Sequence, residues 1–221
     1  MFDLLPVAPD SAFACSKKGV YTFILCFLTW VVLGGILLLT YGNLPLFKWV
    51  HTHHVHLGDI FFRCYTAIGT AVVIIPVLLA LFWYRYRNRY FLLLVISTQI
   101  GSLLINQAMK FAFAHARPVA LYGDEPWFHY ISGEVLHRAH SFPSGHTAGA
   151  FAFAFLLSLL SRSQSVLKAI LLCVAALLVA YSRMYLGQHF FTDIYIGSIE
   201  GVVVCSAVLL AFYKAGYCRF I

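Results

Sequence analysis

Long apolar runs alternate with short polar segments along this chain of 221 residues. A helix needs about 20 mostly apolar residues to cross a bilayer, and intervals of about that length without a charge recur from Lys18 onward. The pattern predicts six membrane-spanning helices, at about residues 20–41, 61–83, 90–114, 144–161, 165–182 and 192–213. Because no stretch is left for a separate soluble domain, we expect one all-α membrane bundle over residues 1–221.

The composition supports a membrane protein. Hydrophobic residues make up 62% of the chain and charged residues only 10%, whereas soluble domains hold about 25% charged residues. The net charge of +7 contains no basic run of the kind that binds nucleic acid. The six cysteines show no CxxC spacing, so we expect packed, inert thiols. We expect no nucleic-acid partner and no obligate protein partner.

Lysine and arginine placement predicts the orientation. With the N-terminus inside, nine of these residues fall on inner segments and six on outer segments. We therefore expect cytoplasmic termini, with residues 1–19 as a cytoplasmic segment and residues 115–143 as an outer loop. The first residues lack the basic-then-apolar order of a cleaved signal peptide, so the first helix should be retained.

The first polar segment on the outer side is KFAFAHARP, at the expected end of the third helix. Lys110 and Arg117 stand seven residues apart, about two helical turns, so both cations are expected on one helix face. Pro118 disfavours a helical conformation for the residue before it and marks the exit. Taken alone, the pattern also fits cations that extend from a helix end to the membrane surface.

The second polar segment is PSGH, residues 143–146, at the start of the fourth apolar run. Ser144, Gly145 and His146 are expected in the first helical turn, where unpaired backbone N–H groups and the helix dipole favour an anion. Gly145 permits close approach of a ligand to the backbone, and His146 could pass a proton to it. The alternative is an ordinary helix cap with an interfacial histidine.

The third polar segment is SRMYLGQHFFTD. Arg183 is expected at the end of the fifth helix, and Gly187 permits a turn. His189 and Asp193 are spaced i,i+4, so the carboxylate can accept a hydrogen bond from one ring nitrogen and leave the other as a lone pair. Catalytic dyads use this arrangement, although a structural His–Asp pair at a helix start has the same spacing.

In this order, the three segments resemble the tripartite motif of the type-2 phosphatidic acid phosphatase family. The matching positions are Lys110, Arg117 and Pro118; Pro143, Ser144, Gly145 and His146; and Ser182, Arg183, His189 and Asp193. The similarity extends over the core from the first helix to the last. It implies a bundle of six membrane helices with an active site at the outer or lumenal face.

The resemblance implies a phosphate-binding role for five of these residues. Lys110, Arg117 and Arg183 would bind phosphate oxygens, and arginine is suited to forked hydrogen bonds. Backbone N–H groups near Ser144 and Gly145, together with the Ser144 hydroxyl, would bind the remaining charge. Cations and a helix N-terminus can stabilise the charge that Mg²⁺ stabilises elsewhere. We expect neither a metal nor another cofactor.

The resemblance also implies the catalytic residues. His189 would attack phosphorus and form a phosphohistidine, and Asp193 would orient His189. His146 would protonate the leaving alkoxide and then deprotonate the attacking water. Two alternatives are a non-catalytic lipid-binding or transport protein on the same scaffold and a vanadate-dependent haloperoxidase. The intact catalytic residues argue against the first, and the apolar spans against the second, because those haloperoxidases are soluble.

The predicted function is metal-independent hydrolysis of the phosphate monoester or pyrophosphate of a membrane lipid. The family implies four candidate substrates: undecaprenyl pyrophosphate, a lipid A phosphate group, phosphatidylglycerol phosphate and phosphatidate. The first two are favoured for a bacterial source, with the enzyme in the inner membrane and its site at the periplasmic face. Residues 119–141 are expected to shape the entrance and the choice of lipid.

Two features are left with open roles. The tract HTHHVH contains His51, His53, His54 and His56, and it is expected to be an interfacial segment rather than a metal site. Glu200 lies seven residues after Asp193 and about 10 Å deeper in the last helix. It suits either a hydrogen-bonded packing role or a substrate channel. Gly197 and Gly201 are expected to allow close helix approach nearby.

Overall fold

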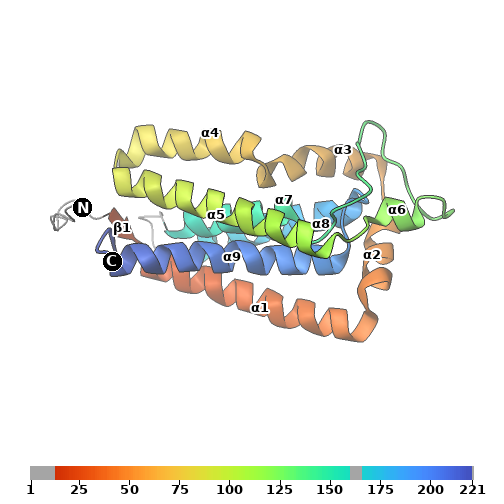
Figure 1. Ribbon diagram of the computed structural model, residues 1–221, viewed down its shortest axis with the longest axis horizontal. Helices are drawn as coiled ribbons and strands as arrows, with labels where there is room; N and C mark the ends of the chain where they lie inside the picture. Colours follow the sequence, from red (N-terminus) through yellow and green to blue (C-terminus); the bar gives the residue numbers. More distant parts are fainter. Residues whose placement is uncertain (1–12, 160–165, 221) are drawn as a thin grey trace.

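Long helices run side by side around a shorter central helix (Figure 1). The computed structural model describes residues 13–159 and 166–220. The long helices are α1 (Lys17–Tyr41), α5 (Arg89–Phe113), α8 (Val166–Tyr185) and α9 (Phe191–Lys214). The central helix is α7 (Gly145–Leu159). Its expected continuation to residue 161 lies outside the described residues.

The helix α7 is apolar on all sides because it is the core of the bundle, and most of its side chains are buried. It contacts α1, α5, α8 and α9. On one side, Phe151 and Phe155 meet Phe27 and Phe23 of α1, with ring centroids 5.9 and 5.3 Å apart. This packing places the start of α7 at the centre of one end of the bundle.

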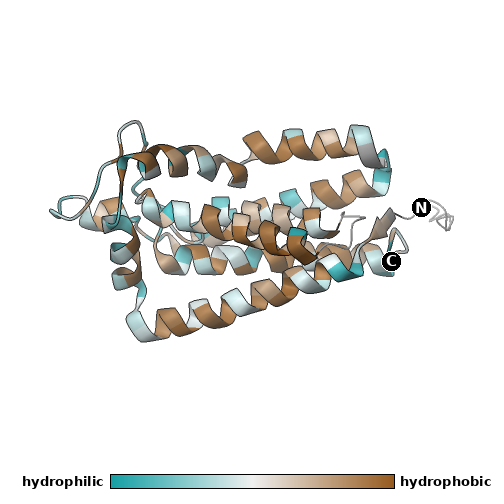
Figure 2. Ribbon diagram, turned by 180° about the vertical axis from the view of Figure 1, so that it is seen from behind, coloured by the Kyte–Doolittle hydropathy of each residue, from teal (hydrophilic) through white to brown (hydrophobic). Residues whose placement is uncertain are grey.

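The surrounding helices consist largely of hydrophobic residues (Figure 2), and many of their large apolar side chains are exposed. Leu39 of α1 is 89% exposed, for example, which a lipid environment accommodates and water does not. Within residues 13–159 and 166–220, four helices have the length and composition to cross a membrane, and a bent helix pair would make a fifth. The chain is therefore a multi-pass integral membrane protein. Of the six expected spans, the fourth corresponds to α7, which is apolar but shorter.

The second expected helix, 61–83, begins earlier and is not continuous. It consists of α3 (His56–Tyr65), the 3₁₀ turn η2 (Thr66–Gly69), α4 (Ala71–Leu81) and the π-helical turn η3 (Phe82–Tyr86). The two halves meet at 53° because Thr70 is extended, with φ −110° and ψ 159°. At the bend, a Cβ on Gly69 would lie 2.3 Å from the carbonyl oxygen of His146, so the main chains touch.

The third expected helix ends between Lys110 and Arg117, the two cations that were expected on one of its faces. The helix α5 stops at Phe113, and Ala114 adopts a left-handed conformation with φ 46°. Pro118 starts the short helix α6 (Pro118–Tyr122) rather than marking the exit of α5. Arg117 is therefore in an extended connection and not on a helix face with Lys110.

The two ends of the bundle differ. At one end, α2 (Asn43–Thr52) lies across the bundle beside α6 and the long loop between α5 and α7 (Figure 1). At the other end, β1 (Phe13–Cys15) pairs in parallel with β2 (Cys218–Phe220). Residues 1–12 of the expected cytoplasmic segment, and Arg162, lie outside the described residues.

Candidate functional site

The three polar segments meet around one cavity of about 450 Å³ at the loop-covered end of the bundle. Its lining includes six of the predicted site residues: Lys110, Arg117, Gly145, His146, Arg183 and His189. They come from α5, the loop that follows it, the start of α7, the end of α8 and the turn before α9. The structure thus brings together the cations and histidines that the sequence singled out.

Arg183 is the most deeply placed cation of this cavity, with 4% of its surface exposed. Its Nη1 donates to Thr66 Oγ1 at 2.9 Å. Its Nε has no hydrogen-bond partner in residues 13–159 and 166–220. A buried N–H without a partner is costly, and a charged one at a cavity wall fits a bound anion.

Arg117 reaches the cavity from the extended loop. Its Nη1 donates to Gln188 Oε1 at 2.8 Å, and its Nε donates to the carbonyl of Ala139 at 3.0 Å. Burial lowers the pKa of Arg117, yet an arginine retains its charge in proteins. Lys110 enters from α5, and its Nζ lies 3.7 Å from where a Cβ on Gly145 would be. Lys110 and Arg117 therefore line the same cavity although they do not share a helix face.

Ser144 caps α7 and is fully buried. Its hydroxyl accepts hydrogen bonds from the Thr147 N–H at 3.4 Å and the Thr147 hydroxyl at 3.0 Å, and its own N–H donates to the carbonyl of Asp193 at 3.0 Å. The sequence suggested that the Ser144 hydroxyl would bind phosphate, but Ser144 is not among the residues that line the cavity. Gly145 and His146 do line it, and N–H groups at a helix start have no intrahelical acceptor.

The predicted His–Asp pair is confirmed as a contact. Nδ1 of His189 lies 3.3 Å from Oδ2 of Asp193, and both side chains are 2% exposed. Asp193 Oδ2 also accepts bonds from the Ser141 hydroxyl and from the Phe190 N–H at 2.9 Å. His189 lies in the turn before α9 rather than in a helix. Burial lowers its pKa, so the ring is neutral, and Nε2 is its remaining nitrogen.

Three residues that position this site were missed. Ser141 donates to Asp193, Thr66 accepts from Arg183, and Gln188 accepts from Arg117. These bonds join positions 52, 117 and 71 residues apart in the chain. No local spacing in the sequence connects such pairs. Gln188 could have been proposed as a site residue from the sequence, because it directly precedes a candidate nucleophile.

The expected close approach of α9 is confirmed. A Cβ on Gly197 would lie 2.6 Å from the carbonyl oxygen of Ser144, and one on Gly201 would lie 2.3 Å from that of Ala148. Glycine at both positions lets α9 pack main chain to main chain against the first turns of α7. His146 is thereby held by backbone contacts.

Glu200 is buried and forms hydrogen bonds with α5. Its carboxylate accepts from the Ser102 hydroxyl at 2.9 Å and from Asn106 Nδ2 at 2.6 Å. Ser102 and Asn106 also line a mostly apolar crevice of about 320 Å³ between α4 and α5, which reaches Gly145. The structure thus favours a hydrogen-bonded packing role, exerted on residues that border the crevice.

The histidine tract was expected to be an interfacial segment. Part of it instead connects the outer loop between α5 and α7 to the helix α8. His51 is fully buried, its Nδ1 donates to the carbonyl of Tyr185 at 3.0 Å, and its Nε2 accepts from the His129 N–H at 3.1 Å. The His54 ring stacks on that of His129 at 3.5 Å. His53 is exposed. In the described part of the chain, no group of three potential metal ligands is present.

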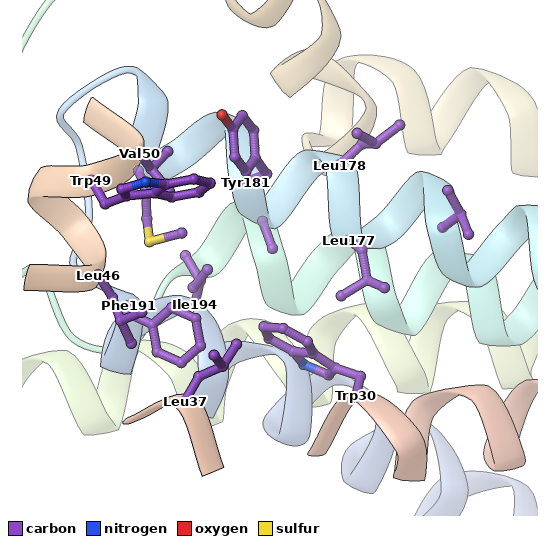
Figure 3. A pocket seen from close by; sticks show the side chains of 13 residues that line it. Trp30, Leu37, Leu46, Trp49, Val50, Leu177, Leu178, Tyr181, Phe191 and Ile194 are labelled. Atoms are coloured by element: carbon purple, nitrogen blue, oxygen red, sulfur yellow. The ribbon is translucent and has the colours of Figure 1, made fainter. Parts of the chain in front are cut away.

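A separate cavity of about 380 Å³ lies among α1, α2, α8 and α9 (Figure 3). Apolar and aromatic side chains such as Trp30, Trp49 and Leu177 line it. The Trp30 N–H donates to Ser198 Oγ at 2.9 Å and is already satisfied. None of the described lining residues is a cation or a carboxylate, so this cavity lacks the groups for phosphate chemistry.

Several known proteins are similar to this chain in sequence or in fold. Undecaprenyl-diphosphatase BcrC of Bacillus subtilis is 26% identical over 77% of this chain and 83% of its own length. Lipid A 4'-phosphatase of Porphyromonas gingivalis is 31% identical over 67% of this chain and 63% of its own. The crystal structure of Aquifex aeolicus LpxE matches with a TM-score of 0.65 and 28% identity, over 76% of this chain and 94% of that one.

The family assignment rests on the match to a family model. Residues 90–217 match the PAP2 superfamily, a range that holds all three motif segments and every predicted site residue. The same residues surround the cavity described above. Sequence, fold and site geometry agree that this chain belongs to the PAP2 superfamily.

Proposed function

We propose that this protein hydrolyses the phosphate monoester or pyrophosphate of a membrane lipid through a phosphohistidine on His189. Family membership makes the protein a lipid phosphatase. The observation that carries the proposed mechanism is the cavity in which Lys110, Arg117 and Arg183 converge on His189 and His146. The unpaired Nε of Arg183 supports an anion there.

In the first half-reaction, Nε2 of His189 forms a bond to phosphorus while the bond from phosphorus to the leaving oxygen breaks. His146 gives its proton to that oxygen. The three cations stabilise the charge on the other phosphate oxygens. Asp193, hydrogen-bonded to Nδ1, stabilises the positive charge that develops on the His189 ring.

In the second half-reaction, water attacks the phosphorus of the phosphohistidine and the bond from phosphorus to Nε2 breaks. His146, now deprotonated, accepts the proton of the water. Phosphate leaves and His189 returns to its neutral form. One histidine therefore acts as acid in the first step and as base in the second.

The lipid tail is proposed to lie against the crevice between α4 and α5, which adjoins the catalytic cavity at Gly145. If α7 is also counted as a span, the total is six, and with both termini in the cytoplasm the site lies at the periplasmic face of a bacterial inner membrane. The names of the relatives favour undecaprenyl pyrophosphate or a lipid A phosphate as substrate.

The proposal includes metal independence. Mg²⁺ binds oxygen ligands, mostly carboxylates and phosphates. Glu134 is the carboxylate among the described residues that line the cavity, and it already accepts a hydrogen bond from Gln188 at 2.8 Å. Three neighbouring cations would oppose a divalent ion.

The test is phosphate release from a panel of lipid phosphates by the purified protein in detergent, with EDTA present. Release should persist in EDTA, and vanadate should inhibit it, because trigonal-bipyramidal vanadate resembles the transition state. Activity that stops in EDTA and returns with Mg²⁺ would refute metal independence. Absence of release from every lipid would refute the function.

A further inference from the structure

A second cavity, of about 520 Å³, adjoins the catalytic cavity. The two share Lys110, Arg117 and His137, and the second cavity adds Arg138 and His140. None of the described residues that line it is acidic. Arg138 and His140 belong to none of the three motif segments. The catalytic cavity therefore continues into a second basic cavity built from the outer loop.

Hydrogen bonds connect the loop that forms the wall of the second cavity to Lys110 and Arg117. The N–H of Arg117 donates to the carbonyl of Arg138 at 3.0 Å, and Nε of Arg117 donates to the carbonyl of Ala139, also at 3.0 Å. His140 has a left-handed backbone, with φ 55°, and its Nδ1 donates to the carbonyl of Lys110 at 3.1 Å. These bonds hold the loop beside Lys110 and Arg117.

The charges of this wall are available to a ligand. The guanidinium of Arg138 is exposed and makes no hydrogen bond or ion pair with the described residues. Among the described residues, Lys110 Nζ likewise has no hydrogen-bond acceptor. Unpaired cations on a concave surface attract anions, and phosphate oxygens are the preferred partners of a forked guanidinium.

From this geometry we propose that the second cavity binds the second phosphate of a diphosphate lipid. This inference rests on the proposed function and narrows its substrate class. The terminal phosphate would react at His189 while the phosphate next to the lipid is held by Lys110 and Arg138. The bond from the terminal phosphorus to the bridging oxygen breaks, giving inorganic phosphate and a lipid monophosphate.

The position of the second cavity also suits a lipid tail. Phe111, which lines the cavity, and Leu103, which lines the crevice between α4 and α5, lie eight residues apart on α5. Eight residues are about 2.2 helical turns, so the two side chains point about 80° apart and lie on one broad face of α5. They are 72% and 60% exposed. A tail attached to a phosphate in the second cavity can follow this apolar stripe into the bilayer.

The test compares farnesyl diphosphate with farnesyl monophosphate, which carry the same tail and differ by one phosphate. Initial phosphate release gives kcat/KM for each in the wild type, Arg138→Ala and Lys48→Gln. Arg138→Ala should lower kcat/KM for the diphosphate by about 10- to 100-fold, as expected for a lost charge-assisted hydrogen bond. It should change the monophosphate value by less than about 3-fold. Lys48→Gln removes a cation outside both cavities, where Lys48 packs over Trp127, and should leave both values unchanged.

Two outcomes would overturn the inference, and they are distinguishable. If the wild type hydrolyses both substrates and Arg138→Ala slows them equally, or slows neither, the second phosphate does not bind Arg138. If the wild type hydrolyses neither, the proposed function fails and this inference fails with it. A further variant strengthens the comparison. Arg138→Lys keeps the charge and loses the forked guanidinium, so its kcat/KM for the diphosphate should lie between those of the wild type and Arg138→Ala.

Discussion

Two His–Asp pairs among the described residues have nearly equal length and very different surroundings. His189 and Asp193 lie 3.3 Å apart with both side chains 2% exposed. His129 and Asp59 lie 3.1 Å apart, with side chains 28% and 17% exposed, where the outer loop meets α3. Asp59 also accepts a hydrogen bond from the Tyr185 hydroxyl at 2.8 Å.

The difference shows that a histidine and a carboxylate within reach do not make a reactive site. In the first pair, the carboxylate binds Nδ1 and leaves Nε2 of His189 at a cavity lined by three cations. In the second pair, the carboxylate binds Nε2 of His129, whose ring is stacked on His54. The first pair leaves one ring nitrogen beside three cations, and the second connects the outer loop to α3.

The largest effect should come from removing the free nitrogen. We expect His189→Ala to lower turnover by roughly 10⁴-fold or more, because no nucleophile remains. His129→Ala is the matched control, and it should retain activity within about 10-fold, since only the loop contact is weakened. Phosphate release and the melting temperature of each variant are the measurements. A well-folded His189→Ala variant with substantial activity would refute the nucleophile assignment.

Replacement of His146 should have an effect that depends on the leaving group. A general acid contributes roughly 10²- to 10⁴-fold, so His146→Ala should slow phosphoenzyme formation by that factor with a lipid monophosphate. With p-nitrophenyl phosphate the loss should be much smaller, because p-nitrophenolate leaves almost without a proton.

Rapid quenching checks this prediction. His146→Ala with p-nitrophenyl phosphate should give a burst of about one equivalent followed by near silence, because hydrolysis of the phosphohistidine lacks its base. Equal slowing of both substrates without a burst would mean that His146 only helps to bind phosphate.

The carboxylates of the two pairs allow a direct comparison. Asp193→Asn should lower turnover by about 10²- to 10³-fold, because an amide does not hold the required tautomer or stabilise the charged ring. Asp59→Asn, the same change in the other pair, should lower it by less than about 3-fold. The ratio of the two losses in kcat is the informative quantity, and a ratio near one would mean that the pairs are functionally equivalent.

The smallest effect concerns pH and the attachment of the outer loop. Burial lowers the pKa of His51 to about 4, whereas a free histidine titrates near 6.5. The detached state therefore binds a proton between these pH values and the attached state does not. Attachment is at full strength above about pH 6.5 and weakens toward pH 4, by up to roughly 3 kcal/mol.

Hydrogen exchange of residues 127–131 measures this attachment. After correction for intrinsic exchange rates, protection in the wild type should fall as the pH decreases from about 6.5 to 4. The control is His51→Gln, whose side-chain oxygen can accept from the His129 N–H but does not titrate. Identical pH profiles for the two proteins would show that His51 does not control the attachment.

Much of the fold could be predicted because lipid requires continuous apolar helices. The starts and ends of α1, α8 and α9 lie within a few residues of the expected spans. The interruption at Thr70 was not predictable, because the flanking segments are apolar on both sides and the bend depends on contact with α7. The helix α2 was also missed, since its role as a cover for the bundle end depends on tertiary contacts.

The site was predictable where spacing in the chain reflects proximity. His189 and Asp193 are close in sequence and in space, and the turn at Gly187, with φ 70°, brings the segment back. Lys110 and Arg117 meet for a different reason from the one their spacing suggested, because the chain leaves the helix between them. Ser141, which bonds to Asp193 from 52 residues away, could be found only from coordinates.

The glycine contacts between α9 and α7 divide the active site into a part that can vary and a part that cannot. Around His146 the main chains of Gly69, Gly197 and Gly201 leave no space for a side chain, so a mutation there moves a helix rather than adjusting a surface. In the outer loop, the Arg138 side chain is exposed and makes no hydrogen bond with the described residues, so it can change without disturbing the bundle. New substrate preferences in relatives of this protein should therefore arise by changes in the outer loop, while the helices that hold the reacting groups are inherited intact.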